Sequence, residues 1–130
     1  MKTDRDRINA SVPEEQFQKS VVDAAKRTGW LCYHTYRSDR SQAGFPDLVM
    51  VKPPRVIFAE LKRQEGKPKP EQERWLETLG QCDGVEVYLW RPGDMDALVK
   101  VLLPHQPLYP EAPAKATSAR YSQSNGNLGQ

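Results

Sequence analysis

Long apolar runs are missing from this chain of 130 residues, of which only 38% are hydrophobic. Because a helix needs roughly 20 consecutive apolar residues to cross a bilayer, we expect no membrane segment and no membrane partner. The first residues, Met1–Arg7, alternate Lys, Asp and Arg with no apolar stretch behind them, so a secretory signal is not expected either. Together these absences predict a cytoplasmic location.

Cysteine is also scarce. The two cysteines, Cys32 and Cys82, are far apart in the chain, with neither Cys-x-x-Cys spacing nor a histidine cluster around them. This pattern argues against a zinc site and against a disulfide framework.

An excess of one charge is absent, since 19 basic residues face 17 acidic ones. The distribution is uneven, however, because residues 37–69 hold eight basic and four acidic side chains, and the remainder of the chain holds 11 basic and 13 acidic ones. Such a basic segment could bind a phosphate backbone. A solvated loop is the commoner cause of the same pattern, so the charges alone do not decide between the two.

The composition changes at Pro104, where four prolines at intervals of three are followed by a polar stretch. We therefore predict one folded domain over residues 8–103 and a disordered tail over residues 104–130. Within the domain, apolar periodicity predicts the order α-β-β-β-α-β-α. The predicted elements are a helix capped by Ser11 and ended by Gly29, strands at 30–36, 47–51 and 56–62, a helix opened by Pro70, a strand at 85–90, and a helix capped by Asp94.

The second and third strands carry the most informative residues. Two consecutive prolines between them exclude a helix and the hydrogen bonds of a β-ladder at that point, so residues 52–55 are predicted to form a hairpin turn. The register of such a hairpin pairs residues whose numbers sum to 107, which places Asp47 opposite Glu60. Like charges in that position destabilise a sheet unless a divalent cation lies between them. Alternation places Lys62 on the same face as both acids.

Each of these residues also has an ordinary explanation. Glu60 and Lys62 could form a solvated ion pair at a strand end, and Asp47 could be a turn aspartate. The run Val56–Leu61, however, is apolar on both faces apart from Glu60, as in a central strand. A charged pair at the end of a buried strand needs partners.

The motifs Gly44-Phe45-Pro46-Asp47-Leu48 and Glu60-Leu61-Lys62 resemble those of VRR-NUC domains, the virus-type replication-repair nucleases of the PD-(D/E)xK superfamily. The resemblance extends over about residues 14–103 and includes a Trp-Arg-Pro segment at residues 90–92. It implies an α/β fold with a restriction-endonuclease-like core, in which helices flank a mixed sheet.

The resemblance also implies roles for individual residues. Asp47 and Glu60 would be metal ligands, Lys62 the catalytic lysine, Glu14 the acid of the first helix and a further metal ligand, and Gln72 a supporting glutamine. For Glu14 a capping role at the helix start is an alternative, and Glu15 could replace it as the functional acid.

Substrate contacts are expected from His34 and from the basic residues around the two motifs. His34 could instead be packed or hydrogen-bonded on its strand, and we expect it to contact phosphate rather than to act as a base. The predicted substrate-binding residues are His34, Arg37, Arg63, Lys67 and Lys69.

Taken together, the residues and the resemblance predict a DNA endonuclease that depends on Mg²⁺ or Mn²⁺ and hydrolyses phosphodiester bonds. The family suggests a phage or bacterial origin, and branched or flapped repair and recombination intermediates, such as Holliday junctions, as substrates. An RNA endonuclease of the same fold and a nucleic-acid-binding module without turnover are the alternatives. A structural interaction protein that uses the tail is a third. A homodimer is plausible for so small a chain on a branched substrate.

Overall fold

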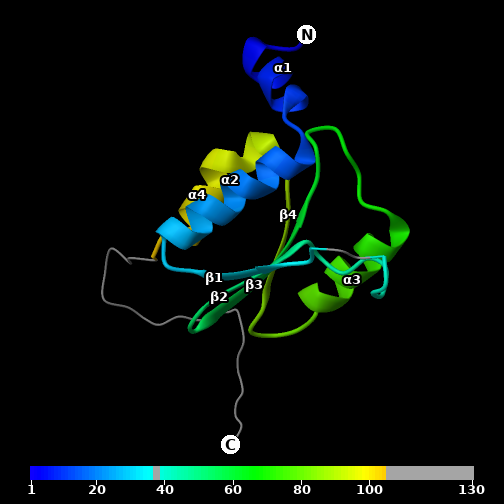
Figure 1. Ribbon diagram of the computed structural model, residues 1–130, viewed down its shortest axis with the longest axis vertical. Coiled ribbons are helices and arrows are strands. Elements are labelled where there is room, and N and C mark those ends of the chain that lie inside the picture. Colours follow the sequence, from blue (N-terminus) through cyan, green and yellow to red (C-terminus); the bar gives the residue numbers. More distant parts are fainter. Residues whose placement is uncertain (37–38, 105–130) are drawn as a thin grey trace, which may run out of the picture.

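The computed structural model describes residues 1–36 and 39–104. Four α-helices, four strands and a short 3₁₀ helix form one α/β unit in this part of the chain (Figure 1). In chain order they are α1 (Asp4–Ser11), α2 (Glu14–Arg27), β1 (Leu31–His34), β2 (Leu48–Lys52), β3 (Arg55–Leu61), α3 (Pro70–Gly80), β4 (Glu86–Trp90), η1 (Pro92–Asp94) and α4 (Met95–Leu102).

The strands form one mixed sheet in the order β1-β2-β3-β4. The pairs β1–β2 and β2–β3 are antiparallel, and β4 runs parallel to β3. In the hairpin, Leu48 lies opposite Ala59 and Val51 lies opposite Val56. Both the predicted register and the predicted mixed sheet flanked by helices are therefore confirmed.

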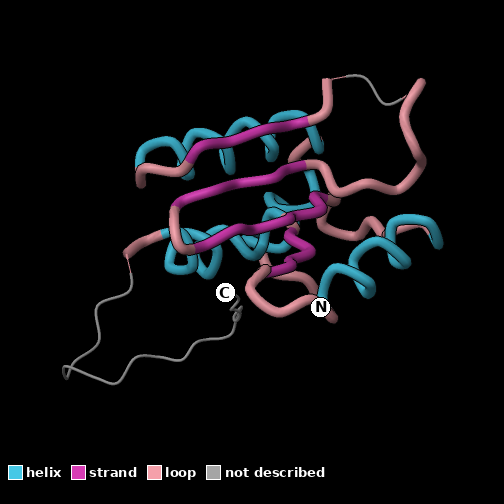
Figure 2. The backbone as a smooth tube through the Cα atoms, turned by 90° about the horizontal axis from the view of Figure 1, so that it is seen from below, coloured by secondary structure: helices cyan, strands magenta, loops and turns pink. Residues whose placement is uncertain are grey.

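The core lies between the sheet and the pair α2 and α4, which cover one face (Figure 1). Phe17, Val21 and Ala25 recur along α2 at helical spacing and are buried against Met50 and Ile57 of the central strands. Seen from below, α2 and α4 lie behind the strands, and α3 lies beside one end of the sheet (Figure 2). No residue of α3 is buried, so the second face of the sheet is only partly covered.

Two predictions about helix ends are wrong. The N-terminal helix α1 was not predicted, and Ser11, the expected cap of the next helix, is instead the last residue of α1. Its hydroxyl donates to the carbonyl of Ile8 at 2.7 Å and is not available to cap α2, which starts after Pro13 without a side-chain cap. Asp94 precedes α4 as expected, but its carboxylate accepts from the backbone N–H of Arg91 at 2.8 Å rather than from α4.

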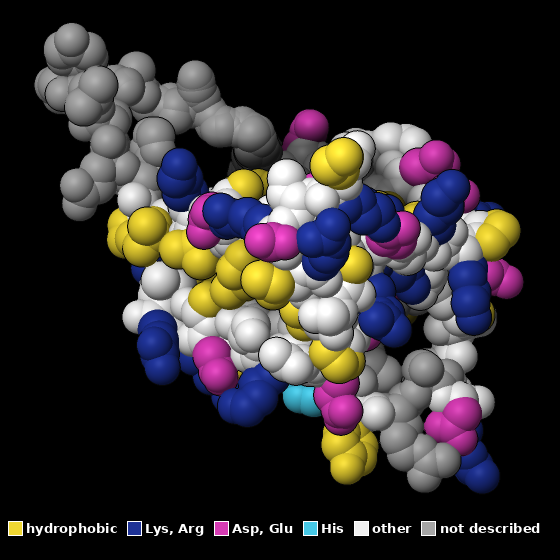
Figure 3. Space-filling model, turned by 90° about the horizontal axis from the view of Figure 1, so that it is seen from above, with side chains coloured by type: hydrophobic (Ala, Val, Ile, Leu, Met, Phe, Trp, Pro, Cys, Tyr) yellow, Lys and Arg dark blue, Asp and Glu magenta, His cyan; other side chains and the backbone are white. Residues whose placement is uncertain are grey.

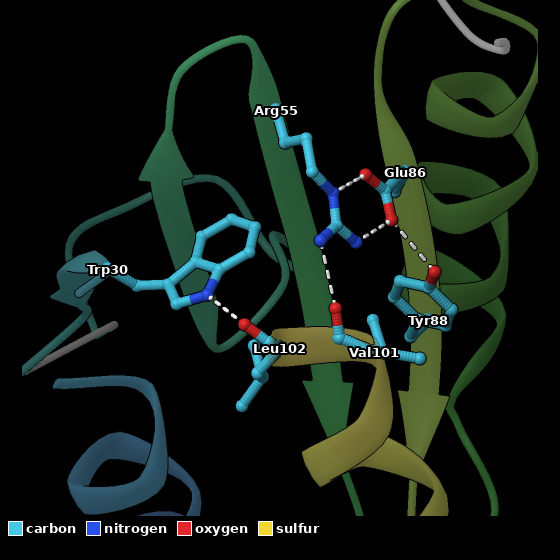
Figure 4. Close-up of polar contacts among 6 residues, drawn as sticks. All are labelled: Trp30, Arg55, Glu86, Tyr88, Val101 and Leu102. Atoms are coloured by element: carbon cyan, nitrogen blue, oxygen red, sulfur yellow. Dashed lines mark hydrogen bonds and ion pairs between the residues drawn. The ribbon is translucent and has the colours of Figure 1, made fainter. Parts of the chain in front are cut away.

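The start of β3 is anchored by Arg55 (Figure 4). Its guanidinium forms a two-pronged ion pair with Glu86 of β4, at 2.6 and 2.7 Å, and donates to the carbonyl of Val101 in α4 at 2.9 Å. It also lies over the ring of Trp30, whose indole N–H donates to the carbonyl of Leu102 at 2.8 Å. Each donor thus has an acceptor, and the cluster fastens the end of α4 to the sheet.

Two features of the described residues bear on partners. No helix among them is long and apolar enough to cross a membrane. On the face that carries α1, α2 and α4, the Lys and Arg side chains are interspersed with Asp and Glu (Figure 3). The predicted disordered tail, apart from Pro104, lies outside the described residues.

Candidate active site

Asp47 is positioned by the loop before β2. Gly44 has φ +94°, and a Cβ there would lie 2.5 Å from the carbonyl oxygen of Glu71 in α3. Glycine is therefore required both for the backbone conformation and for the close approach to α3. The next residue, Phe45, places its ring edge-to-face against Trp75 and Phe58. The loop is held between α3 and the sheet, which fixes the backbone at Asp47.

The carboxylate of Asp47 is held in turn by β3, where its Oδ2 accepts the backbone N–H of Leu61 at 2.8 Å. The neighbouring Glu60 side chain is only 1% exposed, and neither of its oxygens has a hydrogen-bond partner among the described residues. Lys62 Nζ lies 3.3 Å from Glu60 Oε2, and the Lys62 side chain is 13% exposed. Two acids and a lysine thus come together at the end of the hairpin, as the register predicted.

Burial controls the charge state of the two acids. It raises the pKa of Glu60 to about 7, and the negative charge of Asp47 adds to this rise while Lys62 opposes it. Burial also raises the pKa of Asp47, against the N–H of Leu61 and the charge of Lys62. Because one lysine faces two neighbouring carboxyl groups, the site lacks positive charge.

Glu14, the first residue of α2, lies near this pair at an exposed position. Its pKa is raised chiefly by partial loss of water and also by Asp47, whereas Lys62 and Arg63 lower it. Within residues 1–36 and 39–104, no three Asp, Glu, His or Cys side chains lie close enough together to hold a metal ion. The role of Glu14 as a third metal ligand therefore stays a prediction.

The pair Asp47 and Glu60 nevertheless fits a hard divalent cation. Both carboxyl oxygens of Glu60 are buried without a hydrogen bond, a state that costs stability unless another group satisfies them. Mg²⁺ is commonly bound by one or two carboxylates, with other oxygen ligands completing the octahedron. Asp47 and Glu60 are the residues that would hold it.

The side-chain amide of Gln72 is bonded within the start of its own helix. Its Oε1 accepts the backbone N–H of Lys69 at 2.8 Å, which satisfies a free donor at the start of α3. The side chain is half-buried and shares a groove with Asp47. The amide oxygen is thus bonded at the start of α3 and not at Lys62.

The basic loop after β3 is held from both sides. The guanidinium of Arg91 donates twice to the carbonyl of Gly66, at 3.1 and 2.8 Å, and Gln64 Oε1 accepts the N–H of Gly93 at 2.7 Å. Arg63 donates to the carbonyl of Ala10 at 3.2 Å. This loop therefore has a defined shape, which its composition alone did not indicate.

The other predicted substrate-binding residues are placed as follows. Lys67 and Lys69 are exposed, and Lys69 also lines the groove beside Asp47. His34 is exposed and pairs with Leu48, which places it on the opposite face of the sheet from Glu60. Arg37 lies outside the described residues. Substrate binding by these residues stays a prediction.

The groove itself was missed by the sequence analysis. It lies between β1 and the start of α3, has a volume of about 980 Å³, and reaches Asp47. Tyr33 and Trp75 line it in addition to Lys69 and Gln72. Strand alternation was the signal that could have pointed to Tyr33, because it places Tyr33 and His34 on opposite faces of the sheet.

Comparison with solved structures finds a match that is described as a "VRR_NUC domain". The match has a TM-score of 0.54 and 24% sequence identity, and it covers 67% of this chain and 94% of the other. This chain has the fold of a VRR_NUC domain. No family model and no curated protein matches the sequence. The resemblance stated from the two motifs is thereby confirmed for the fold, and any activity must be argued from the site.

Proposed function

We propose that this protein is a DNA endonuclease that depends on Mg²⁺ or Mn²⁺ and hydrolyses phosphodiester bonds. The observation that carries the proposal is the pairing of the buried Glu60 with the half-buried Asp47, with Lys62 beside them. A buried acid beside a second carboxyl group destabilises a fold, because it loses hydration and is repelled by its neighbour. A function that needs both acids gives a reason for keeping them. Binding of nucleic acid alone would favour basic residues in this position.

The residues of the site have separate tasks in this reaction. A cation held by Asp47 and Glu60 would lower the pKa of a water molecule at the site and would neutralise charge that develops on the phosphate. Lys62 lies beside Glu60 and can donate a hydrogen bond to the attacking water and orient it. The N–H of Leu61 keeps one oxygen of Asp47 fixed, so that carboxylate does not need to reorganise during the reaction.

The deciding experiment measures cleavage of labelled DNA by the purified chain with added metal ions. Mg²⁺ or Mn²⁺ should support cleavage, whereas Ca²⁺, which is larger and coordinates more loosely, should allow binding with little turnover. Asp47→Asn should raise the metal concentration needed for half-maximal rate, because an amide is a weaker ligand than a carboxylate. Full activity in excess EDTA would contradict the proposal.

We also propose that the substrate is branched or flapped DNA, such as a repair intermediate. The basic loop directly follows Lys62 in the chain and the groove reaches Asp47, so a substrate with both paired and unpaired parts would have a surface for each beside the paired acids. The rate should be compared on junctions, flaps, single strands, linear duplexes and matched RNA. Cleavage of RNA alone would indicate the RNA endonuclease, and tight binding without cleavage would indicate a binding module.

A homodimer stays a prediction. Sedimentation of the purified chain at micromolar concentration, with and without a junction substrate, measures its mass directly.

A further inference from the structure

The groove beside Asp47 offers more than access to the paired acids. One wall comes from the edge strand β1 and from described residues between β1 and β2, and the other comes from the first turns of α3. Because Asp47 also lines the groove, whatever occupies it lies next to the candidate reacting phosphate. Its volume of about 980 Å³ is large for a side-chain gap and is in the range of a ligand site.

Two exposed tyrosines line this groove in positions that packing does not require. Tyr33 is 60% exposed and Tyr36 is 90% exposed, although neither ring is needed to complete the core. Tyr33 lies opposite Val49, which in turn lies opposite Phe58, so its ring is on the same face of the sheet as Glu60. Trp75 faces the groove from α3.

The charge of the groove limits what can bind there. Lys69 is the basic side chain among its described lining residues, and Asp39, Asp47 and Glu71 line it as well. A phosphate backbone is therefore not attracted along this wall by charge alone. A nucleobase is uncharged and has two apolar faces, and stacking on tyrosine or tryptophan suits every base.

We propose that this groove is a stacking site for unpaired nucleotides of the DNA strand that is cut, with Tyr33 as its main platform. The inference rests on the proposed endonuclease function and adds a location and a substrate feature to it. A paired base cannot stack on a side chain without leaving its own helix. Unpaired nucleotides beside the cleaved bond should therefore accelerate cleavage.

The test measures binding of a single strand that contains the fluorescent base 2-aminopurine, in Ca²⁺ so that cleavage is slow. Binding to the parent protein should quench the fluorescence by stacking. Tyr33→Ala should weaken binding by about fivefold to a hundredfold, as alanine substitution of a stacking platform typically does. Tyr33→Phe keeps the ring and should retain binding within about twofold.

The chain offers a matched control at Leu31. It lies two residues from Tyr33 on the same strand and face, is 75% exposed, and does not line the groove. Leu31→Ala should leave both the affinity and the quenching unchanged. If Tyr33→Ala fails to fold, Tyr33→Leu keeps an apolar side chain without the aromatic face and should show the same loss of quenching.

A salt series separates stacking from general charge. The loss caused by Tyr33→Ala should be the same at low and high salt, because no counterion is released by an uncharged ring. A loss that disappears at high salt would contradict stacking.

Cleavage assays distinguish failure of this inference from failure of the proposed function. If the parent protein cuts flapped DNA and Tyr33→Ala cuts it within twofold of the parent rate, with binding and quenching like those of Leu31→Ala, the stacking site is wrong and the endonuclease stands. If no nucleic acid is cut with any metal and quenching still depends on Tyr33, the endonuclease is wrong and the groove is a binding site.

Discussion

At the residue scale, Lys62 is the side chain whose structural and catalytic roles are easiest to separate. It is mostly buried beside Glu60, so it is not the exposed strand-end charge of the ordinary explanation. Lys62→Ala removes the group that would orient water but leaves both acids in place. We expect DNA cleavage to fall by about a hundredfold or more, as for loss of a positioned donor.

The control for this variant is Lys52→Ala at the other end of the hairpin, where Nζ donates to the carbonyl of Thr28 at 2.7 Å. That change should lower stability by about 1 kcal/mol and leave the rate unchanged. Added metal should rescue Asp47→Asn but not Lys62→Ala. A folded Lys62→Ala protein that cuts DNA within threefold of the parent rate would show that the Glu-x-Lys match is accidental.

Glu60 makes stability depend on pH in the absence of metal. Its pKa is raised to about 7, so the folded state holds a proton that the unfolded state releases near the ordinary value of 4.5. The contribution of Glu60 to the free energy of unfolding should therefore be highest below pH 4.5, and it should fall as the pH rises toward 7. Urea titrations in EDTA between pH 5 and pH 8 measure this trend.

Glu60→Gln is the matched control, because it keeps the shape and removes the titration. Its unfolding free energy should show a smaller fall over the same pH range. Mg²⁺ should stabilise the parent protein more at pH 8 than at pH 6, since a protonated carboxyl is a poor ligand. Equal pH dependence of parent and variant would show that Glu60 titrates normally.

Gly44 provides a test of how Asp47 is positioned. Gly44→Ala places a methyl group against the backbone of Glu71 and strains a residue at φ +94°. We expect a loss of about 1–3 kcal/mol in the free energy of unfolding, together with lower activity. Gly80→Ala, at the end of α3 where nothing lies within 4 Å, should be neutral or slightly stabilising.

At the scale of elements, the loop between β3 and α3 is predicted to contact phosphate. Replacing Arg63, Lys67 and Lys69 together by glutamine should weaken DNA binding and reduce the dependence of affinity on salt, because fewer counterions are released. If the slope of log affinity against log salt matches that of the parent, the loop is solvated and does not contact phosphate.

The control for charge alone is a second triple variant. Arg5 and Arg7 of α1 and Lys19 of α2 are exposed, and each forms an ion pair with an acidic side chain. Replacing these three by glutamine changes the net charge by the same amount without altering the loop itself. The salt dependence should then stay close to that of the parent.

The elements that could be predicted from sequence are those with strong local signals. Two prolines fixed the position of the hairpin turn, and the turn fixed the register that brings Asp47 beside Glu60. The helix α1 has no apolar stripe and no buried residue, so periodicity could not reveal it. It is capped instead by Thr3 and Asp6, whose side chains and backbones bond reciprocally.

At the scale of the whole molecule, the candidate site divides into a local and a non-local part. The paired acids and Lys62 lie on one hairpin, and a short piece of sequence was sufficient to predict them. The groove joins segments around Tyr33, Asp47 and Trp75 that are distant in the chain. The pairing of β1 with β2 spans a long loop, so neither turn chemistry nor alternation could fix it.

The two ends of β3 differ in a way that bears on how this protein can change. Arg55 at one end has an acceptor for each of its guanidinium nitrogens, whereas Glu60 at the other end has an ion pair with Lys62 but no hydrogen-bond donor for either oxygen. An apolar residue in place of Glu60 would remove an unsatisfied buried acid and should make the protein more heat-resistant. In a randomised library screened only for survival of heating, replacements at Glu60 should be enriched and replacements at Arg55 depleted. Screens for durability must therefore be coupled to a screen for cutting, or they will select inert proteins.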